Sequence, residues 1–471
     1  MGSAIKFGTS GWRAIIADEF TFDNVRRVSM AIADTLLAAG LAPRGVVVGY
    51  DTRFLSEDFA AEAARVLASR GIRCAVSSVA IPTPAVAHAV RHHGFGGAIN
   101  ITASHNPADY NGLKFSTEQG APSPPALTAE VEKRTAALPA GVSVGEAPAD
   151  LIEEADFLEP YLAQLDTLVR FEVMKKAGIR VVIDPRWGAG RGWYDAALKR
   201  HGIPCEMIHD FRDVTFGGGG PDVSARNLED LGRTVTGSGF TLGLAADGDA
   251  DRFGVVDADG TWVNPNLVLA LLADYLAETR GFRLGVGRSY ATTGLLDAVA
   301  RHYGVPVHQT PVGFKYLGEL ILEGDKVFIA GEESAGMSMA GHVPEKDGIL
   351  AGLLAAEMVA ATGRTVAQLR DALFAKVGTL HSARLDLRVT PAQVQSLRAH
   401  MASPPDRLGG RAVARATVWD GLRLDFADGS WLLMRPSGTE PVVRCYVEAP
   451  TPAELEDLQR AGKAELMGDA A

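Results

Sequence analysis

The sequence predicts a large α/β protein with several domains. Four short apolar runs each lead into a loop rich in glycine and functional side chains, which is typical of strands whose ends carry chemistry. With 471 residues, 47% of them hydrophobic, the chain is too long for one ordinary core. Breaks in the pattern place the expected domains at residues 1–150, 151–258, 259–378 and 379–471.

The first loop follows the apolar run 96–101 and contains Ser104 and His105. Pro107 interrupts the strand, and Lys114 follows ten residues after the serine. A hydroxyl at the end of a strand beside a histidine is a candidate nucleophile. A serine in such a loop is also often a simple turn or cap residue, so the other loops decide between the two interpretations.

The second loop places Asp247, Asp249 and Asp251 after the apolar run 240–246. Carboxylates are hard ligands that suit Mg²⁺, and three of them this close would repel one another without a cation. An EF-hand is excluded because Arg252 stands where that loop requires glycine. A solvated acidic turn is the alternative, and Arg252 could anchor a carboxylate or touch substrate.

The third loop brings Glu332, Glu333 and Ser334 after the run 326–330. These groups suit a polyhydroxylated ligand, because sugar hydroxyls need acceptors. Acidic residues also favour a helix N-terminus, where the dipole stabilises them, and both interpretations can hold together.

The fourth loop contains Arg435, Ser437, Gly438 and Thr439 after the run 431–434. The fork of arginine donors matches phosphate oxygens, and the hydroxyls and backbone N–H groups can add to it. Taken alone, the same string is a plain turn with a surface arginine.

The connecting segments carry clear breaks and periodicities. Segment 118–150 is rich in Pro, Ala and Ser and predicts a loop, a helix and a linker. The remaining expected elements are a strand at 179–184, a glycine-rich interruption at 216–227, a hairpin turn at 258–265, helices at 267–279 and 365–374, and an alternating strand at 383–389 with one exposed face.

The net charge and the cysteines indicate the kind of partner and compartment. The formal net charge of -11 argues against nucleic acid or an anionic membrane as a partner. No apolar run is long enough to span a bilayer and no leader pattern opens the chain, while three scattered cysteines favour a reducing cytoplasm. An anionic substrate would then need a local basic pocket, which Arg13, Lys315, Arg435 and Arg444 could form.

The motifs resemble the α-D-phosphohexomutase superfamily, the phosphoglucomutase/phosphomannomutase enzymes. TASHNP, DGDADR, GEESAG and RPSGTEP stand in family order, and FGTSGWR at 7–13 and GYDTR at 49–53 are also similar. The resemblance covers roughly residues 5–450. It implies three similar mixed α/β domains and a smaller C-terminal α+β domain, with the active site in the central cleft and the last domain moving to control access.

The resemblance also implies the roles of individual residues. Ser104 would carry a phosphoryl group, and the three aspartates would hold Mg²⁺ together with an oxygen of that phosphoserine. A hexose 1,6-bisphosphate would form, turn around within the site and return its other phosphate to the serine. The substrate-binding residues would be Thr9, Ser10, Arg252, Lys315, Glu332, Ser334, His342, Lys346, Arg435, Ser437, Gly438, Thr439 and Arg444.

The general base is left open by the sequence. Arg13 and Lys114 match family positions near the reacting phosphate, and Lys114 could act if burial or neighbouring cations lower its pKa. His105 is a further candidate, although a histidine in a crowded turn is more often structural. Many bacterial phosphomannomutase-type members carry a histidine where this chain has Gly336, and His342 and Lys346 could compensate, as in the phosphoglucomutase branch.

The sugar loop favours glucose phosphates. Glu333 occupies the variable place, where dual glucose/mannose enzymes more often carry methionine and phosphoglucosamine mutases glutamine. We therefore expect glucose 1-phosphate and glucose 6-phosphate as substrates, with glucose 1,6-bisphosphate as activator and mannose phosphates as the second choice. The enzyme would be a monomer or a homodimer. A metal-dependent phosphatase and a non-catalytic sugar-phosphate sensor are the alternatives from other classes.

Overall fold

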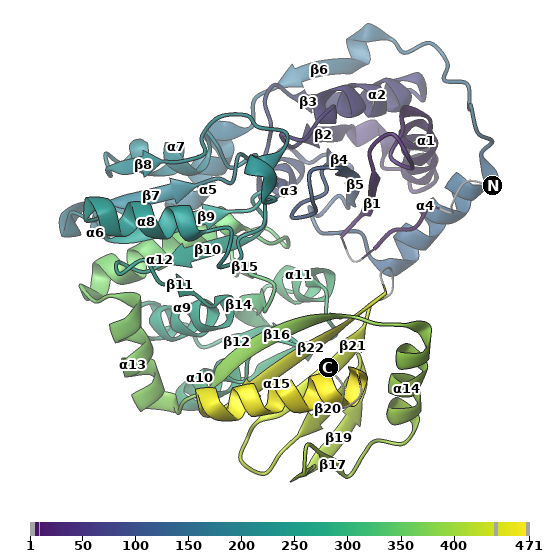
Figure 1. Cartoon of the computed structure of the whole chain (residues 1–471). Coiled ribbons are helices and arrows are strands. Elements are labelled where there is room, and N and C mark those ends of the chain that lie inside the picture. The colour runs from purple at the N-terminus through teal and green to yellow at the C-terminus, as the bar shows by residue number, and fades with distance from the viewer. Residues whose placement is uncertain (1–4, 9, 438–440, 468–471) are drawn as a thin grey trace.

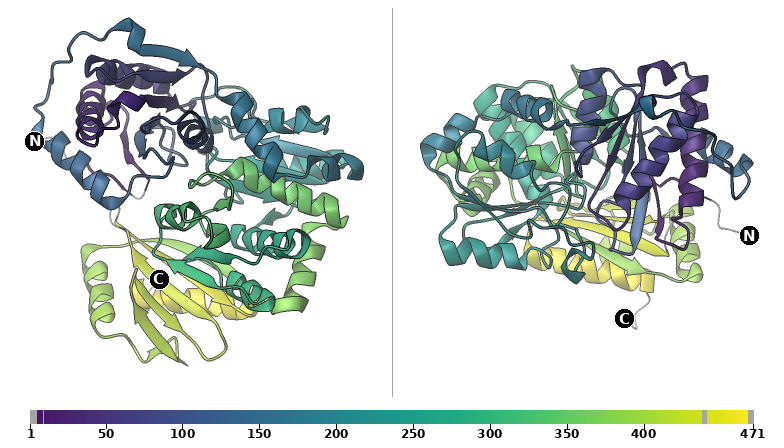
Figure 2. Two further views of the ribbon diagram at one scale, coloured as in Figure 1. Left: turned by 180° about the vertical axis from the view of Figure 1, so that it is seen from behind. Right: turned by 90° about the horizontal axis from the view of Figure 1, so that it is seen from above.

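The structure, a computed structural model, describes residues 5–8, 10–437 and 441–467 (Figure 1). It has three mixed α/β domains and a C-terminal α+β domain, which confirms the predicted fold class. The views in Figures 1 and 2 show the four parts around a common centre, with the fourth, in light green to yellow, beside the third.

The first domain is a six-stranded sheet in the order β1-β5-β4-β2-β3-β6, with α1 and α2 packed on one face and α3 on the other. Val46 and Val48 of β2 belong to the core under α1 and α2, whereas Val47 belongs to the opposite core, as the two-residue period of a strand requires. Its elements are β1 (Trp12–Ile15), α1 (Phe22–Ala38), β2 (Val46–Tyr50), α2 (Ser56–Ser69), β3 (Cys74–Ser77), α3 (Thr83–His93), β4 (Ala98–Ile101), β5 (Tyr110–Ser116), α4 (Pro125–Ala137) and β6 (Ile152–Ala155).

The edge strand β6 lies beyond residue 150. It pairs in parallel with β3, from Cys74 opposite Ile152 to Ser77 opposite Ala155. The first sheet therefore extends past the expected boundary into residues that the sequence interpretation assigned to the second domain.

The second domain has the sheet order β11-β10-β9-β7-β8. The metal-loop aspartates stand between β9 and its antiparallel neighbour β10. Its elements are α5 (Leu158–Leu168), α6 (Phe171–Ala177), β7 (Val181–Asp184), α7 (Tyr194–Lys199), β8 (Cys205–Met207), α8 (Glu229–Ser238), β9 (Leu242–Ala246), β10 (Phe253–Val256) and β11 (Trp262–Val263).

The third domain has the order β13-β12-β14-β15 and shares its core with the second. The apolar helix α12 is buried along most of its length and packs against α6, β9 and β10 of the second domain as well as α9 and β15 of its own. The elements are α9 (Pro265–Arg280), β12 (Gly285–Ser289), α10 (Leu295–Tyr303), β13 (Val307–Thr310), α11 (Phe314–Leu322), β14 (Val327–Glu332), β15 (Gly336–Met339), α12 (Gly348–Thr362) and α13 (Val366–Val377).

The fourth domain is an antiparallel sheet in the order β16-β22-β21-β20-β19. Val443, Cys445 and Val447 of β22 pack into a core with Leu458 of α15, which leaves the alternate residues on the other face. The elements are β16 (His381–Arg388), α14 (Pro391–Ala402), β17 (Arg407–Leu408), β18 (Arg411–Ala412), β19 (Arg415–Val418), β20 (Leu422–Asp425), β21 (Trp431–Pro436), β22 (Val442–Ala449) and α15 (Pro452–Met467).

Short 3₁₀ turns at Ala42–Arg44, Ala149–Leu151 and Phe216–Gly218 complete the described elements. Within the described ranges no single helix has the length and apolar character to cross a membrane; α12 and α13 meet that test only as a pair bent by 82°.

Candidate active site

Ser104 lies directly beyond β4 and is almost completely buried. Its Oγ donates to Asp247 Oδ2 at 2.8 Å and is 3.3 Å from His105 Nδ1. Its φ of 54° is in the left-handed region, which is costly for a residue other than glycine. The predicted nucleophile therefore touches the predicted metal loop, across a domain boundary.

The serine loop is held by Arg53, from the GYDTR string. Arg53 is fully buried, forms a 3.1 Å ion pair with Asp51 and hydrogen-bonds to four backbone carbonyls. Those carbonyls belong to Ser104 (2.7 Å), Asn106 (2.6 Å), Pro107 (2.7 Å) and Tyr110 (2.9 Å). A planar guanidinium can satisfy this many acceptors at once, so Arg53 fixes the loop in its strained shape. Sequence reasoning noted the string but assigned it no role.

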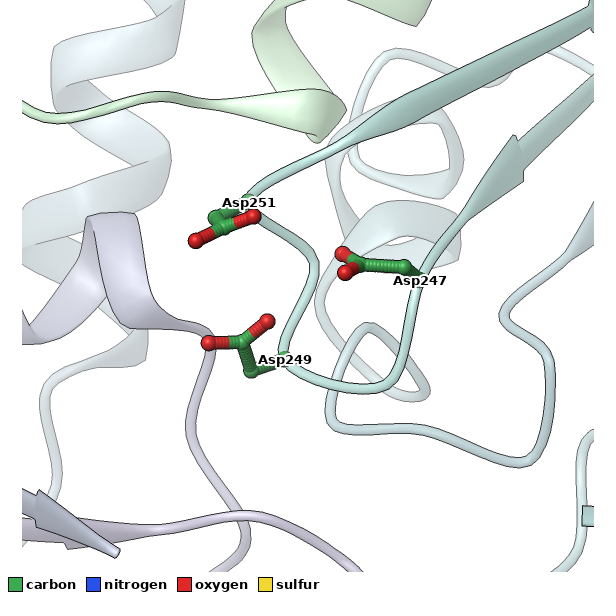
Figure 3. A group of neighbouring side chains, drawn as sticks. All are labelled: Asp247, Asp249 and Asp251. Atoms are coloured by element: carbon green, nitrogen blue, oxygen red, sulfur yellow. The ribbon is translucent and has the colours of Figure 1, made fainter. Parts of the chain in front are cut away.

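The three aspartates point toward a common space, as Figure 3 shows. All are buried, and one oxygen of each lies within 4.8 Å of the others. Ala250, with a φ of 57°, curls the loop between them. Among the described residues, Asp249 Oδ1 and Asp251 Oδ1 have no hydrogen-bond partner. Unsatisfied buried carboxylate oxygens with this spacing fit a divalent cation, and Mg²⁺ is the hard ion that such ligands suit.

Two buried lysines neutralise the same cluster. Lys114 Nζ contacts Asp249 Oδ2 at 2.6 Å and Asp251 Oδ2 at 2.7 Å, and Lys346 Nζ is 3.2 Å from Asp251 Oδ2. Burial alone would raise the pKa of Asp251, but the lysines outweigh it and lower that pKa. Burial and the other two carboxylates raise the pKa of Asp247.

Lys114 does not have the lowered pKa that a lysine base requires. Burial favours its neutral amine, but the charges of Asp249 and Asp251 outweigh burial and raise its pKa. The pKa of Lys346 is raised in the same way, with Asp251 and Glu345 as the main opposing charges. In this arrangement both lysines are cations suited to charge stabilisation. Lys114 therefore lacks the lowered pKa that a role as general base would require.

His105 has the opposite character. Burial, followed by the charges of Arg252 and Arg13, lowers the pKa of His105 well below its usual value. The imidazole beside Ser104 is therefore neutral at physiological pH, and the same shift makes it a weaker proton acceptor than an ordinary histidine. Arg13 lies on β1, and its Nη1 donates to Asn106 Oδ1 at 2.7 Å within the serine loop.

The sugar loop is the turn of a β-hairpin, and the helix N-terminus proposed as an alternative is wrong. β14 pairs antiparallel with β15, with Glu332 opposite Gly336, and Ala335 between them has a φ of 69°. Glu332 Oε1 accepts from Gly313 N–H at 2.8 Å. Burial and the neighbouring Glu333 raise the pKa of Glu332 to about 7.

Gly336 leaves room for a lysine side chain. A Cβ at this position would lie 2.3 Å from Cδ of Lys346. The place of Gly336, where the resemblance led us to expect a histidine in other members, is thus filled by the Lys346 side chain, which reaches back from the segment after the hairpin. This geometry brings Lys346 Nζ to 3.2 Å from Asp251 Oδ2 and gives a physical reason for the glycine, while a role of Lys346 in substrate binding stays a prediction.

The phosphate loop is described only in part, because Gly438 and Thr439, like Thr9, lie outside the described residues. Arg435 Nε donates to Asp420 Oδ1 at 2.9 Å, and Arg435 lies opposite Arg444 in the β21–β22 register. The Ser437 N–H donates to Val442 O at 2.8 Å. The two arginines therefore share one face of the sheet.

A cavity of about 760 Å³ lies among the four domains, beside the serine, metal and sugar loops. Its walls include His105 of the first domain, Arg252 of the second and Glu333 and Ser334 of the third. Sequence reasoning missed most of its lining, including the polar residues Asp222, Asn264, Asn266, Arg384, Asp386 and Tyr446. The only available signal was the alternating strand at 383–389, in which Arg384 and Asp386 are polar positions.

His342, Lys315 and Ser10 lie outside this lining. His342 is buried, and its Nε2 lies 2.7 Å from Oδ2 of Asp347, which also accepts from Tyr161 O–H at 2.8 Å. His342 is therefore structural rather than a substrate ligand, because the helix cap Asp347 holds its ring in the interior. Lys315 is on the first turn of α11, and Ser10 borders a small hollow beside Lys114.

The chain matches the four domain families of phosphoglucomutase/phosphomannomutase in order. The matches cover domain I at residues 4–140, domain II at 159–260, domain III at 264–377 and the C-terminal domain at 387–462. The chain belongs to the phosphoglucomutase/phosphomannomutase family. It is accordingly an isomerase, an intramolecular phosphotransferase that acts on hexose phosphates, and the aspartate cluster is consistent with the Mg²⁺ that this family uses.

Similar proteins within the family carry different names. A phosphoglucomutase of Komagataeibacter xylinus is 30% identical over 97% of this chain and 89% of its own. A phosphoglucosamine mutase of Moorella thermoacetica is 33% identical over 96% of this chain and 97% of its own. A crystal structure from Thermus thermophilus, provisionally named phosphomannomutase, is 34% identical with a TM-score of 0.86 and covers 98% of this chain and 99% of that one. The percentage of sequence identity therefore does not decide which hexose phosphate is the substrate.

Proposed function

We propose that this enzyme is a phosphoglucomutase that interconverts glucose 1-phosphate and glucose 6-phosphate through a phosphorylated Ser104 and a hexose 1,6-bisphosphate. The observation that carries the proposal is the 2.8 Å contact between Ser104 Oγ and Asp247. It puts a strained, buried hydroxyl at the edge of the carboxylate cluster, where a phosphoryl oxygen would complete the ligand set.

Asp247, Asp249, Asp251 and an oxygen of the phosphorylated Ser104 would hold Mg²⁺. The bound ion would act as a Lewis acid that offsets negative charge on the phosphoryl group. Lys114 adds positive charge beside the same carboxylates. Phosphoryl transfer depends mainly on positioning and charge stabilisation, and this chain provides both through rigid loops.

The remaining residues would bind and orient the sugar phosphate. Glu333 and Ser334 line the cavity and offer acceptors to sugar hydroxyls, while Arg435 and Arg444 offer forked donors to the non-reacting phosphate. His105, whose Nδ1 lies 3.3 Å from Ser104 Oγ, is placed to take a proton as the serine is phosphorylated again, although its lowered pKa makes it a weak base. Enclosure by four domains limits attack by water, which would release inorganic phosphate.

Glucose is the proposed sugar because Glu333 is a carboxylate acceptor at the variable place of the loop. Phosphoglucosamine is a candidate beside mannose phosphate, the second choice from the sequence, since phosphoglucosamine mutases are among the similar proteins at 30–33% identity. The net charge and the unpaired cysteines also lead us to place the enzyme in the cytoplasm.

A coupled assay tests the proposal. We would measure conversion of the 1-phosphates of glucose, mannose and glucosamine with Mg²⁺ and a trace of the matching 1,6-bisphosphate. Glucose 1-phosphate should turn over fastest, and Ser104→Ala should reduce the rate at least about 1,000-fold because the phosphoryl acceptor is lost. Faster turnover of another sugar would correct the substrate. Stoichiometric release of inorganic phosphate would indicate a phosphatase instead.

A further inference from the structure

One face of the fourth-domain sheet forms ordered rows of side chains. Across β16 and β22, Ser382 lies opposite Glu448, Arg384 opposite Tyr446, and Asp386 opposite Arg444. Arg444 in turn lies opposite Arg435 on β21. Residues opposite each other in an antiparallel pair share a face, so Arg384 lies on the same face as the phosphate-binding arginines, one row along.

Arg384 is positioned by its neighbours. Its Nε donates to Asp386 Oδ1 at 2.7 Å and its Nη2 to Asp386 Oδ2 at 2.6 Å, and its guanidinium lies 5.9 Å from the centre of the Tyr446 ring. The forked pairing uses the Nε–Nη2 edge and leaves Nη1 outside it. All three residues line the cavity, so the guanidinium is both held and presented to a ligand.

The positive charge of Arg384 interacts electrostatically with residues of both the sugar loop and the serine loop. Glu333 of the sugar loop interacts with it electrostatically, and it also acts on His105 of the serine loop. Neighbouring strands lie about 4.8 Å apart, and successive residues on one face of a strand lie about 6.8 Å apart. Arg384 and Arg435 are two strands and one row apart, so their α-carbons are separated by roughly 12 Å. Arg384 thus lies within electrostatic reach of the serine loop and in the same sheet face as the distal phosphate clamp.

We propose that Arg384 binds a phosphate group of the hexose 1,6-bisphosphate while that intermediate turns around in the cleft. The inference rests on the proposed function. For the two phosphates to exchange places, the distal one must leave Arg435 and Arg444 before the other can occupy them. The partly exposed guanidinium of Arg384, oriented by Asp386 on the same face, offers the dianion a second contact during the exchange, so the intermediate stays in the cleft.

The test measures escape of the intermediate from the phosphorylated enzyme. Phosphoenzyme is mixed with glucose 1-phosphate, and free glucose 1,6-bisphosphate per turnover is counted for wild type, Arg384→Ala and Arg384→Lys. Arg384→Ala should release about tenfold more, the effect of one lost charge-assisted hydrogen bond, and Arg384→Lys an intermediate amount. Activity of Arg384→Ala without added bisphosphate should fall, and added bisphosphate should restore it, which a purely structural defect would not allow.

Arg398→Ala is the matched control, because Arg398 is an exposed arginine of the same domain on α14 and does not line the cavity. Its release of bisphosphate should equal that of wild type. If Arg384→Ala also equals wild type while wild type forms the bisphosphate, the inference is wrong and the proposed function stands. If wild type forms no bisphosphate, the proposed function itself fails.

Discussion

At the scale of single residues, the site uses backbone conformations that ordinary residues avoid. Ser104, Ala250 and Ala335 all have left-handed φ angles, and they stand in the serine, metal and sugar loops respectively. Such strain persists only where the surroundings over-determine it, as Arg53 does for the serine loop. The three loops are therefore set in shape before any ligand arrives.

Glu332 provides a prediction about pH at this scale. Its folded pKa of about 7 exceeds the ordinary 4.5, so the unfolded chain loses its proton first and wild-type stability falls between about pH 4.5 and 7. Glu332→Gln removes that cost. Relative to wild type, the free energy of unfolding of the variant should rise by about 1–3 kcal/mol from pH 4.5 to 8, measured by urea denaturation.

Glu319→Gln is the control for this experiment, since Glu319 is exposed on α11 of the same domain. Its difference from wild type should be the same at both pH values. A pH-independent effect of Glu332→Gln would contradict the raised pKa.

At the scale of elements, the β14–β15 hairpin and the Lys346 segment fit together only because residue 336 is glycine. Gly336→Ala should displace the Lys346 side chain from Asp251 and lower the mutase rate at least about tenfold, with much less effect on stability than on rate. Steady-state kinetics with a thermal melt checks both parts.

Gly237→Ala is the matched control, because Gly237 lies on α8, has no unusual φ, and would bring an added Cβ within 4 Å of no other atom. It should be neutral or slightly stabilising, as alanine favours a helix over glycine. An unchanged rate for Gly336→Ala would show that Lys346 does not contribute to the chemistry.

The sequence predicted the four loops and the strands that lead into them, because apolar runs ending in Gly and functional groups are local signals. Strands end shortly before Ser104 and Asp247 as predicted, whereas β21 continues through Arg435 to Pro436. What it missed depends on distant contacts. The burial of His342 against Asp347 and the approach of Arg384 to the cavity come from packing between segments that no local pattern reports.

At the scale of the whole molecule, the buried carboxylate of Glu448 is one of several contacts between the fourth domain and the third, beside an apolar cluster and the hydrogen bond from the Val312 N–H to Asp420 Oδ2 at 2.7 Å. Glu448 accepts from the Gly294 N–H at 2.8 Å and from Thr293 Oγ1 in the third domain, and from Trp431 Nε1 at 2.8 Å and Ser382 Oγ at 2.9 Å in its own. A buried carboxylate that accepts hydrogen bonds from four donors in two domains stabilises the interface between those domains.

Glu448→Gln should weaken this interface. The variant should lower the free energy of unfolding by about 1–3 kcal/mol, because some of the four donors lose their acceptor. Limited proteolysis between residues 375 and 385 should also become faster. Sugar phosphate that bridges the domains should slow that cleavage in wild type. Glu456→Gln, on the exposed side of α15, should leave the cleavage rate unchanged, and equal rates for both variants would contradict the role of Glu448.

The burial of α12 between the second and third domains has an evolutionary consequence. This helix completes the core of both domains. The aspartate loop and the sugar loop therefore belong to two domains that depend on the same core helix. A chimera that takes either domain alone from a relative would face a mismatched core. We therefore expect sugar preference to pass between such enzymes only when the second and third domains are exchanged together.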